Sequence, residues 1–335
     1  PVRPRVLPLR AAAPHPGEEV RLAAIDVGSN SIRQIIADVT PEGRIRVLDE
    51  MKAAPRLGTG LDRAGRLGEE AMGHALEALQ RMATLARQYG VAKVEAVATS
   101  AVRDAANGRT FVDRVRRETG LRIRLLHGEE EARLAYRSAL AHFDLARGRS
   151  VVMDVGGGSL ELAMAADGLV ERLVSLPFGA IRMTEQYLGL APSRKDVRRL
   201  RQAVRDEIRK ALPLRDWRGA QLICSGGTFT NLAGIFLYRQ GSPSAAGRVH
   251  GTRVPREELE HIIDLLRACP PEERAHVRGL NVERSDIILA GLVVAAEVMA
   301  RIESRELQVS VYGIREGLLL ESAHVPTIPA DRGEA

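Results

Sequence analysis

The feature that most constrains the fold of this chain is a segment that occurs twice. Residues 21–39 read RLAAIDVGSNSIRQIIADV, and residues 149–167 read RSVVMDVGGGSLELAMAAD. Aligning Asp26 with Asp154 matches an aspartate, a valine, a glycine and a serine at equivalent places, 128 residues apart. That spacing is the length of a domain, because the repeats of solenoid proteins recur every roughly 20–50 residues. The sequence therefore predicts two homologous halves.

Each copy begins with an apolar strand, a turn of small residues and a second strand. Hairpin turns follow at residues 41–43 and 167–168, and a third strand follows each turn. Elsewhere apolar residues recur at helical spacing, and these stretches alternate with short apolar strands. We expect helices over 69–89, 109–119, 128–143, 193–211, 228–239, 255–268, 285–301 and from Ile314, and strands over 94–99, 123–127, 221–225 and 306–312. The predicted fold class is α/β, with two domains related by internal duplication.

Length and composition suit two folded domains, since the 335 residues are 45% hydrophobic and 27% charged. We expect domain I over 20–128 plus 309–325, and domain II over 129–308. Residues 1–19, rich in proline and arginine, and residues 326–335 are expected to be a disordered lead-in and tail. The chain does not begin with methionine, so either end could be a cut in a longer protein.

Composition excludes several classes of protein. Two cysteines, Cys224 and Cys269, are too few for a disulfide framework or a structural zinc site, so we expect a cytoplasmic protein. The longest apolar run, 287–296, is shorter than the roughly 20 residues of a membrane span. The net charge of +6 permits a polyanionic partner, but aromatic residues make up only 3% and no nucleic-acid-binding module is present. We therefore expect neither a membrane nor a nucleic acid as partner.

Three glycine-rich turns, DVGSNS, DVGGGS and SGGTFT, point to anion binding. Glycine lets a ligand approach the backbone, and consecutive N–H groups form an anion nest. Asp26 and Asp154 end apolar strands, where a carboxylate without a partner is costly to bury. A hard divalent cation such as Mg²⁺ compensates that cost. Glu161, on the strand after the second turn, could face the same ligand.

The order of six motifs resembles one known family. DVGSNSIR, ATSAVRDAAN, HGEEEARLAY, DVGGGSLEL, SGG and ERSDIILAGL occur in that order within residues 20–325. This order is similar to that of the exopolyphosphatase and guanosine pentaphosphate phosphohydrolase (Ppx/GppA) family, which belongs to the actin, hexokinase and sugar-kinase superfold. The resemblance implies two actin-like (ribonuclease H-like) domains with an interdomain cleft. It also implies hydrolysis of the terminal phosphoryl group of inorganic polyphosphate or of pppGpp, with Mg²⁺ or alternatively Mn²⁺, and it is compatible with a homodimer.

The resemblance assigns roles to individual residues. Glu131 takes the position of the general base that activates water, although the residues alone do not choose among Glu129, Glu130 and Glu131. Asp154 and Glu161 match the acidic pair associated with the metal, and Asp26 joins them as a metal-binding candidate. The phosphate-binding candidates are the glycine turns and two arginines: Gly28, Ser29, Asn30, Ser31, Gly156, Gly157, Gly158, Ser159, Gly226, Gly227, Arg33 and Arg103.

Other functions are compatible with parts of this pattern. A kinase or ATPase of the same superfold shares DVGGGS, but the combination of ATSAVRDAAN with GEEEARLAY separates this chain from it. A non-catalytic alarmone sensor would not need Glu131, Asp154 and Glu161. We favour polyphosphate over pppGpp, because short family members resemble exopolyphosphatases and long ones carry a further C-terminal helical domain of the HD type. A truncated long form stays open.

Overall fold

The computed structural model describes residues 19–212, 217–242 and 248–324, and it consists of two compact units. The first unit consists of two segments of the chain, the residues up to His127 and those from Ile314 onward. The second unit is the segment between them, from Gly128 to Gly313. The disorder predicted for 1–19 and 326–335 falls almost entirely outside the described residues. Residues 309–313, predicted for domain I, belong to the second unit because Val309 pairs with Cys224 and the Ser310 amide donates to the Cys224 carbonyl over 2.8 Å.

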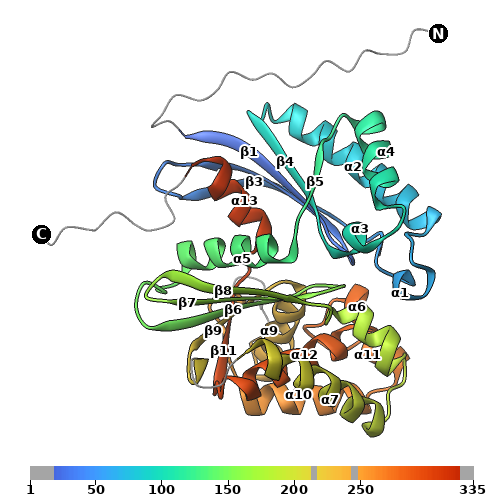
Figure 1. Ribbon diagram of the computed structural model, residues 1–335, viewed down its shortest axis with the longest axis vertical. Helices are drawn as coiled ribbons and strands as arrows, with labels where there is room; N and C mark the ends of the chain where they lie inside the picture. The colour runs from blue at the N-terminus through green and yellow to red at the C-terminus, as the bar shows by residue number, and fades with distance from the viewer. Residues whose placement is uncertain (1–18, 213–216, 243–247, 325–335) are drawn as a thin grey trace, which may run out of the picture. The chain divides into compact units, whose positions relative to one another are not determined.

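The first unit is built on a five-stranded sheet with the order β3-β2-β1-β4-β5. β1 pairs antiparallel with β2 and parallel with β4. Its elements are β1 (Val20–Val27), β2 (Ile32–Val39), β3 (Ile45–Ala53), α1 (Leu61–Ala64), α2 (Glu69–Gln88), β4 (Lys93–Ala98), α3 (Ser100–Asp104), α4 (Gly108–Thr119), β5 (Ile123–Leu125) and α13 (Ile314–Ser322). Helices α2 and α4 cover one face of the sheet, and α13 packs on the other (Figure 1).

The second unit has a six-stranded sheet with the order β10-β11-β9-β6-β7-β8. Its elements are α5 (Gly128–His142), β6 (Arg149–Val155), β7 (Leu160–Ala166), β8 (Leu169–Leu176), α6 (Ala180–Met183), η1 (Thr184–Leu188), α7 (Arg194–Ala211), β9 (Gln221–Ser225), α9 (Gly227–Arg239), β10 (Arg253–Pro255), α10 (Arg256–Ala268), α11 (Pro271–Arg274), η2 (Val282–Arg284), α12 (Ile288–Arg301) and β11 (Glu306–Val309). Helix α5 packs on one face, and α7, α9, α10 and α12 form the large core on the other.

The two sheets repeat one topology, so the predicted α/β class and internal duplication are confirmed. β3-β2-β1-β4-β5 corresponds strand by strand to β8-β7-β6-β9-β11, with β10 added at the edge. The register irregularity at Ile36/Ala37 in the first sheet has its counterpart at Met164/Ala165 in the second, at the same 128-residue offset. Hydrogen bonds from Gly28 to Ser31 and from Gly156 to Ser159 close equivalent turns. The cleft expected between the halves stays a prediction.

Most predicted elements are present, and two boundaries differ for a visible reason. The strand expected over 306–312 ends at Val309, because the Ser310 hydroxyl and the Tyr312 backbone form a tight turn. The helix expected from residue 285 begins at Ile288, after a 3₁₀ turn at Val282–Arg284. Within the described ranges, no helix combines the length and the hydropathy that a membrane span needs.

Candidate active site

A row of polar side chains crosses the second sheet near the carboxyl end of β6. Asp154 on β6 lies directly opposite Glu161 on β7, with Ser225 and Ser175 as the next partners on either side. Cross-strand partners point to the same face of a sheet, with their Cβ atoms close together. The Ser225 hydroxyl donates to Asp154 Oδ2 over 2.7 Å, and the Ser175 hydroxyl donates to Glu161 Oε1 over 2.9 Å. The two serines thus hold both carboxylates in the row; we call Ser175, Glu161, Asp154 and Ser225 the acidic row.

The first turn of α5 lies beside the acidic row. A Cβ placed on Gly128 would come within 2.2 Å of the Ser175 hydroxyl, so only glycine lets the helix start this close to β8. Glu131 belongs to the same turn and is 2% exposed, whereas Glu129 is exposed and Glu130 is intermediate. Of the three consecutive glutamates, Glu131 is therefore the one that is buried, and it belongs to the helix turn whose Gly128 packs against Ser175.

The donor set of the acidic row fits a magnesium ion. Two like charges directly opposite each other on adjacent strands repel, and Glu161 is only 3% exposed. Mg²⁺ prefers carboxylate oxygens and usually keeps several water ligands, so one or two carboxylates suffice. Among the described residues, no group of three or more histidines, cysteines, aspartates or glutamates could hold a metal ion. Asp154 and Glu161 are thus the pair of the acidic row that would hold the ion.

The equivalent row in the first unit is basic. Asp26 on β1 lies opposite Arg33 on β2, which lies opposite Lys52 on β3. Helix α13 adds Arg315, which donates to the Gln34 carbonyl over 3.2 Å. Burial lowers the pKa of Arg315, but the charges of neighbouring carboxylates, Asp26 among them, outweigh burial and raise it. The metal-binding role of Asp26 stays a prediction.

The first glycine turn presents a buried amide. The Ser29 hydroxyl lies 3.0 Å from the Ser100 hydroxyl, and Ser29, Asn30 and Ser31 are all buried. Asn30 is 3% exposed, and neither its side-chain nitrogen nor its side-chain oxygen has a hydrogen-bond partner within the described part of the chain. Burying an amide in this way is costly unless a ligand satisfies it. Asn30 is therefore the residue of this turn that points most directly to a bound ligand.

The second glycine turn is tied to α6 through its carbonyl groups. The Gly156 carbonyl accepts from Ala180, and the Gly157 carbonyl accepts from Ile181 and Arg182, over 2.9–3.2 Å. The nest that binds an anion is made of N–H groups. The hydrogen bonds to α6 use only carbonyl groups of the turn, so they are compatible with anion binding by its N–H groups. The phosphate-binding roles of Gly156, Gly157, Gly158 and Ser159 stay predictions.

The third turn links the acidic row to an arginine that the sequence reasoning did not select. Gly226 has φ +94°, and a Cβ there would lie 2.7 Å from Asp154 Oδ1. A Cβ on Gly227 would lie 2.2 Å from the guanidinium of Arg284, which is 6% exposed. Arg284 belongs to the ERSDIILAGL motif, so an arginine inside a quoted motif was the signal that could have identified it. It brings a buried positive charge to the start of α9.

The Arg103 side chain contacts other residues of the first unit. Its Nη1 donates to the Leu126 carbonyl over 2.8 Å, and its Nε lies 3.4 Å from Asp104 Oδ1. It therefore holds α3 against the segment that follows β5. Its phosphate-binding role, like that of Arg33, stays a prediction.

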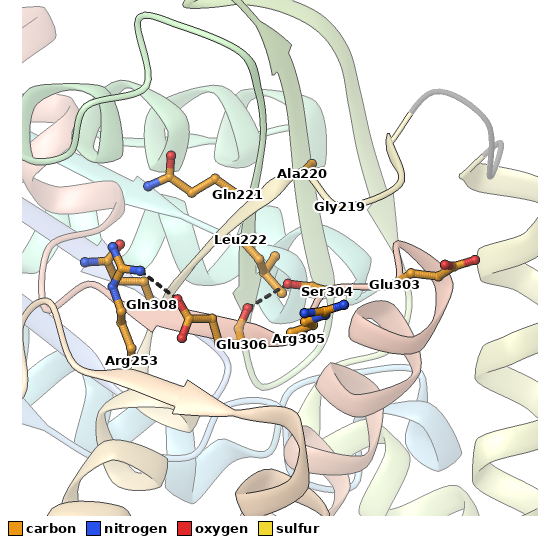
Figure 2. Close-up of a pocket in the computed structure, with 10 residues that line it drawn as sticks. All are labelled: Gly219, Ala220, Gln221, Leu222, Arg253, Glu303, Ser304, Arg305, Glu306 and Gln308. Atoms are coloured by element: carbon orange, nitrogen blue, oxygen red, sulfur yellow. Dashed lines mark hydrogen bonds and ion pairs between the residues drawn. The ribbon is translucent and has the colours of Figure 1, made fainter.

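Two further features do not belong to the candidate site. A groove of about 670 Å³ lies at the amino ends of β9 and β11, where Arg253 pairs with Glu306 (Figure 2). Ligands of α/β sheets bind at the carboxyl ends of strands, where the acidic row lies. The Cys224 thiol lies near Asp154, but burial, and then the charge of Asp154, raise its pKa well above the usual value. Cys224 therefore stays protonated and is a poor nucleophile.

The comparison with protein families shows the family of this chain. The model of the Ppx/GppA phosphatase family matches residues 35–325. This chain belongs to that family. The exopolyphosphatase 1 of Mycobacterium leprae is 32% identical over 304 residues, covering 90% of this chain and 89% of the relative. The exopolyphosphatase 2 of Mycobacterium tuberculosis is also 32% identical, covering 90% and 98%.

Solved structures of Ppx/GppA proteins have the same fold. The Aquifex aeolicus family member is 30% identical, with a TM-score of 0.78 over 92% of this chain and 98% of that one. An exopolyphosphatase from Cytophaga hutchinsonii gives a TM-score of 0.84 at 26% identity, over 92% and 99%. The predicted actin-like, two-domain fold is confirmed.

Proposed function

We propose that this protein is a magnesium-dependent exopolyphosphatase that releases the terminal phosphoryl group of inorganic polyphosphate as orthophosphate. The observation that carries the proposal is the buried Glu131 in the helix turn that lies against the acidic row. Relatives with the name exopolyphosphatase, 32% identical over 90% of this chain, support polyphosphate as the substrate class.

Each unit carries its own set of charged groups suited to this chemistry. In the first, the Asn30 amide and the Arg33 and Arg103 guanidiniums bind phosphate oxygens, because guanidinium pairs well with phosphate. In the second, Arg284 and the turn at Gly226 add donors close to Asp154. A Mg²⁺ ion bound by Asp154 and Glu161 would supply positive charge to the phosphoryl oxygens. Phosphoryl transfer depends mainly on such positioning and charge, since its transition state needs little covalent help.

Glu131 acts on the attacking water. Its carboxylate accepts the water proton while the water oxygen bonds to the terminal phosphorus and the bridging P–O bond breaks. The products are orthophosphate and a polyphosphate one unit shorter. A general base of this kind contributes typically about 10²–10⁴-fold to the rate.

Phosphate release without any acceptor tests the proposal. The purified chain, incubated with long-chain polyphosphate and Mg²⁺, should release orthophosphate, and chelation by EDTA should stop the release. A parallel reaction with pppGpp measures the alternative substrate, and faster release from pppGpp would replace polyphosphate in the proposal. Binding of either compound without release would identify a sensor instead. Phosphate transfer that needs an acceptor would identify a kinase. A homodimer and a cytoplasmic location stay predictions.

A further inference from the structure

Three aromatic rings of the second unit pack together just after the end of β11. The His142 ring, in the last turn of α5, stacks on the Tyr312 ring, with centroids 3.8 Å apart and an angle of 19° between the planes. The His250 ring meets Tyr312 edge-on, with centroids 4.9 Å apart and an angle of 66°. Both arrangements are favourable for aromatic pairs. The Tyr312 ring is therefore held by two histidines from other elements, and we call the three residues the aromatic cluster.

Hydrogen bonds fix the elements that carry the aromatic cluster. His142 Nδ1 donates to the Ser138 carbonyl over 2.7 Å, which fixes its ring on α5. Backbone hydrogen bonds of 2.8 and 2.9 Å hold the loop that carries His250 to β11. The Ser310 hydroxyl accepts from the Tyr312 amide over 3.1 Å and donates to the Tyr312 carbonyl over 2.9 Å. The position of the Tyr312 ring therefore determines the position of the backbone beside it.

The residue that follows Tyr312 lies against the acidic row. A Cβ built on Gly313 would lie 3.8 Å from Asp154 Oδ2 and 3.9 Å from the Ser225 hydroxyl oxygen. These two atoms are the ones that form the 2.7 Å hydrogen bond of the row. The backbone at Gly313 thus borders the Asp154 carboxylate on the side of Ser225.

Helix α5 connects the aromatic cluster to the other end of the acidic row. Its first turn packs against Ser175 through Gly128, and its last turn carries His142 onto Tyr312. Between these ends it packs on β8, β7 and β6, the strands that carry three of the four residues of the row. A helix of 15 residues is roughly 22 Å long, enough to pass four strands spaced about 4.8 Å apart. The helix that carries Glu131 is therefore anchored at both ends of the row.

We propose that Tyr312 is a positioning residue for the Mg²⁺ site of the acidic row. Its ring, held in the aromatic cluster, keeps the turn from Ser310 to Gly313 against the Asp154 carboxylate and its serine partner. Groups that orient metal ligands typically change metal affinity about 10–100-fold when they are altered. This inference rests on the proposed function, since it concerns the metal ion of the same site.

Binding of Mg²⁺ in the absence of any substrate tests Tyr312. Calorimetry measures the affinity of the full chain for Mg²⁺ alone, and Asp154→Asn gives the signal that belongs to other places on the protein. Tyr312→Ala should weaken binding at the row about tenfold or more, because the turn beside Asp154 loses its anchor. Tyr312→Phe should keep the wild-type affinity, because it keeps the ring and loses only the hydroxyl. His142→Ala, which removes the stacking partner and leaves Tyr312 in place, should also weaken binding.

Tyr238→Ala is the matched control. Tyr238 is a half-buried tyrosine whose ring also contacts another side chain, the guanidinium of Arg278, at 5.0 Å from the centroid. It lies in the last turn of α9, roughly 16 Å along the helix from Gly227, the residue beside the third glycine turn. This variant loses a ring of the same kind and should bind Mg²⁺ with wild-type affinity.

Three outcomes would overturn the proposal. Wild-type affinity in Tyr312→Ala or in His142→Ala would show that the aromatic cluster does not act on the row. A loss in Tyr312→Phe as large as that in Tyr312→Ala would assign the effect to the hydroxyl, and an equal loss in Tyr238→Ala would assign it to general destabilisation. Failure of the wild type to release phosphate would count against the proposed hydrolysis only, because this measurement needs no turnover.

Discussion

Asp154 lies directly opposite Glu161 on neighbouring strands, whereas Asp26, at the equivalent place in the other half, lies opposite Arg33. One duplicated position thus carries two opposed carboxylates in one half, and a carboxylate opposite an arginine in the other. A cation bound in the second half would relieve the repulsion there, and the arginine and lysine of the row in the first half would suit phosphate. The two halves thus share one strand topology and differ here in the residue opposite the aspartate.

Glu131→Gln should lower the rate of phosphate release from polyphosphate at least about a hundredfold, because glutamine cannot accept the proton of the attacking water. Affinity for tripolyphosphate should be retained. Glu129→Gln, an exposed change in the same helix turn, is the control and should keep the wild-type rate. Turnover by Glu131→Gln at the rate of that control would remove Glu131 from its role.

Asp154→Asn should abolish the rise in melting temperature that Mg²⁺ gives the wild type, because a ligand that binds only the folded state stabilises it. Asp26→Asn, the equivalent change in the first half, should keep this rise. Thermal melts of each variant in EDTA and in Mg²⁺ make the comparison. A Mg²⁺ response lost in Asp26→Asn but kept in Asp154→Asn would reverse the assignment.

Glu161→Gln should raise the Mg²⁺ concentration needed for half-maximal phosphate release about tenfold or more, since one of two charged ligands is lost. In EDTA its melting temperature should equal or exceed that of the wild type, because the repulsion with Asp154 is gone. An unchanged Mg²⁺ requirement would exclude Glu161 as a metal ligand.

Gly227→Ala should destabilise the protein, because its Cβ would lie 2.2 Å from the Arg284 guanidinium. In an Arg284→Ala background the same change should cost much less, since the clashing group is absent. A double-mutant cycle from denaturant unfolding measures this coupling. If the changes in the free energy of unfolding of the two single variants add up to that of the double variant, Arg284 does not pack against Gly227.

Asp38 should make stability depend on pH. Hydrogen bonds from Arg21, at 2.7 Å, and from Arg46, at 2.6 Å, hold the pKa of this carboxyl below its ordinary value, the first being the main cause. Its contribution is therefore present above the unfolded pKa of about 3.9 and disappears as the pH falls through the lower folded value. Asp38→Asn should unfold at lower denaturant concentration than the wild type at pH 7. The difference between the two denaturant midpoints should be smaller at pH 3. A difference between the midpoints that grows in acid would contradict the lowered pKa of Asp38.

Much of the fold could be predicted because its signals are local. The strand, turn and strand pattern around Asp26 and Asp154 depends on neighbouring residues, and the repeat itself reveals the duplication. Some helix ends could also be predicted. The start of α7 is an example, where Ser193 and Asp196 form a capping box. The end of the strand at Val309 was missed, because a serine turn and a bond to Cys224 decide it.

The site could be predicted only in part. The glycine turns and the acidic residues could be proposed from the sequence, but nothing in the residues themselves distinguishes the three consecutive glutamates. Packing of the Gly128 turn against Ser175 leaves Glu131 buried and Glu129 exposed. Arg284 lies far from Gly227 in the sequence, so no local pattern joins them.

The sequence by itself determined two related halves, their glycine turns and the family to which they belong, because short-range patterns encode strands, turns and motifs. Only the tertiary structure decided that Asp154 lies opposite a carboxylate and Asp26 opposite an arginine, and which glutamate is buried. Those relationships depend on the register between strands and on close packing between elements that are distant in the sequence. A single Cβ atom, as at Gly128, would prevent such packing.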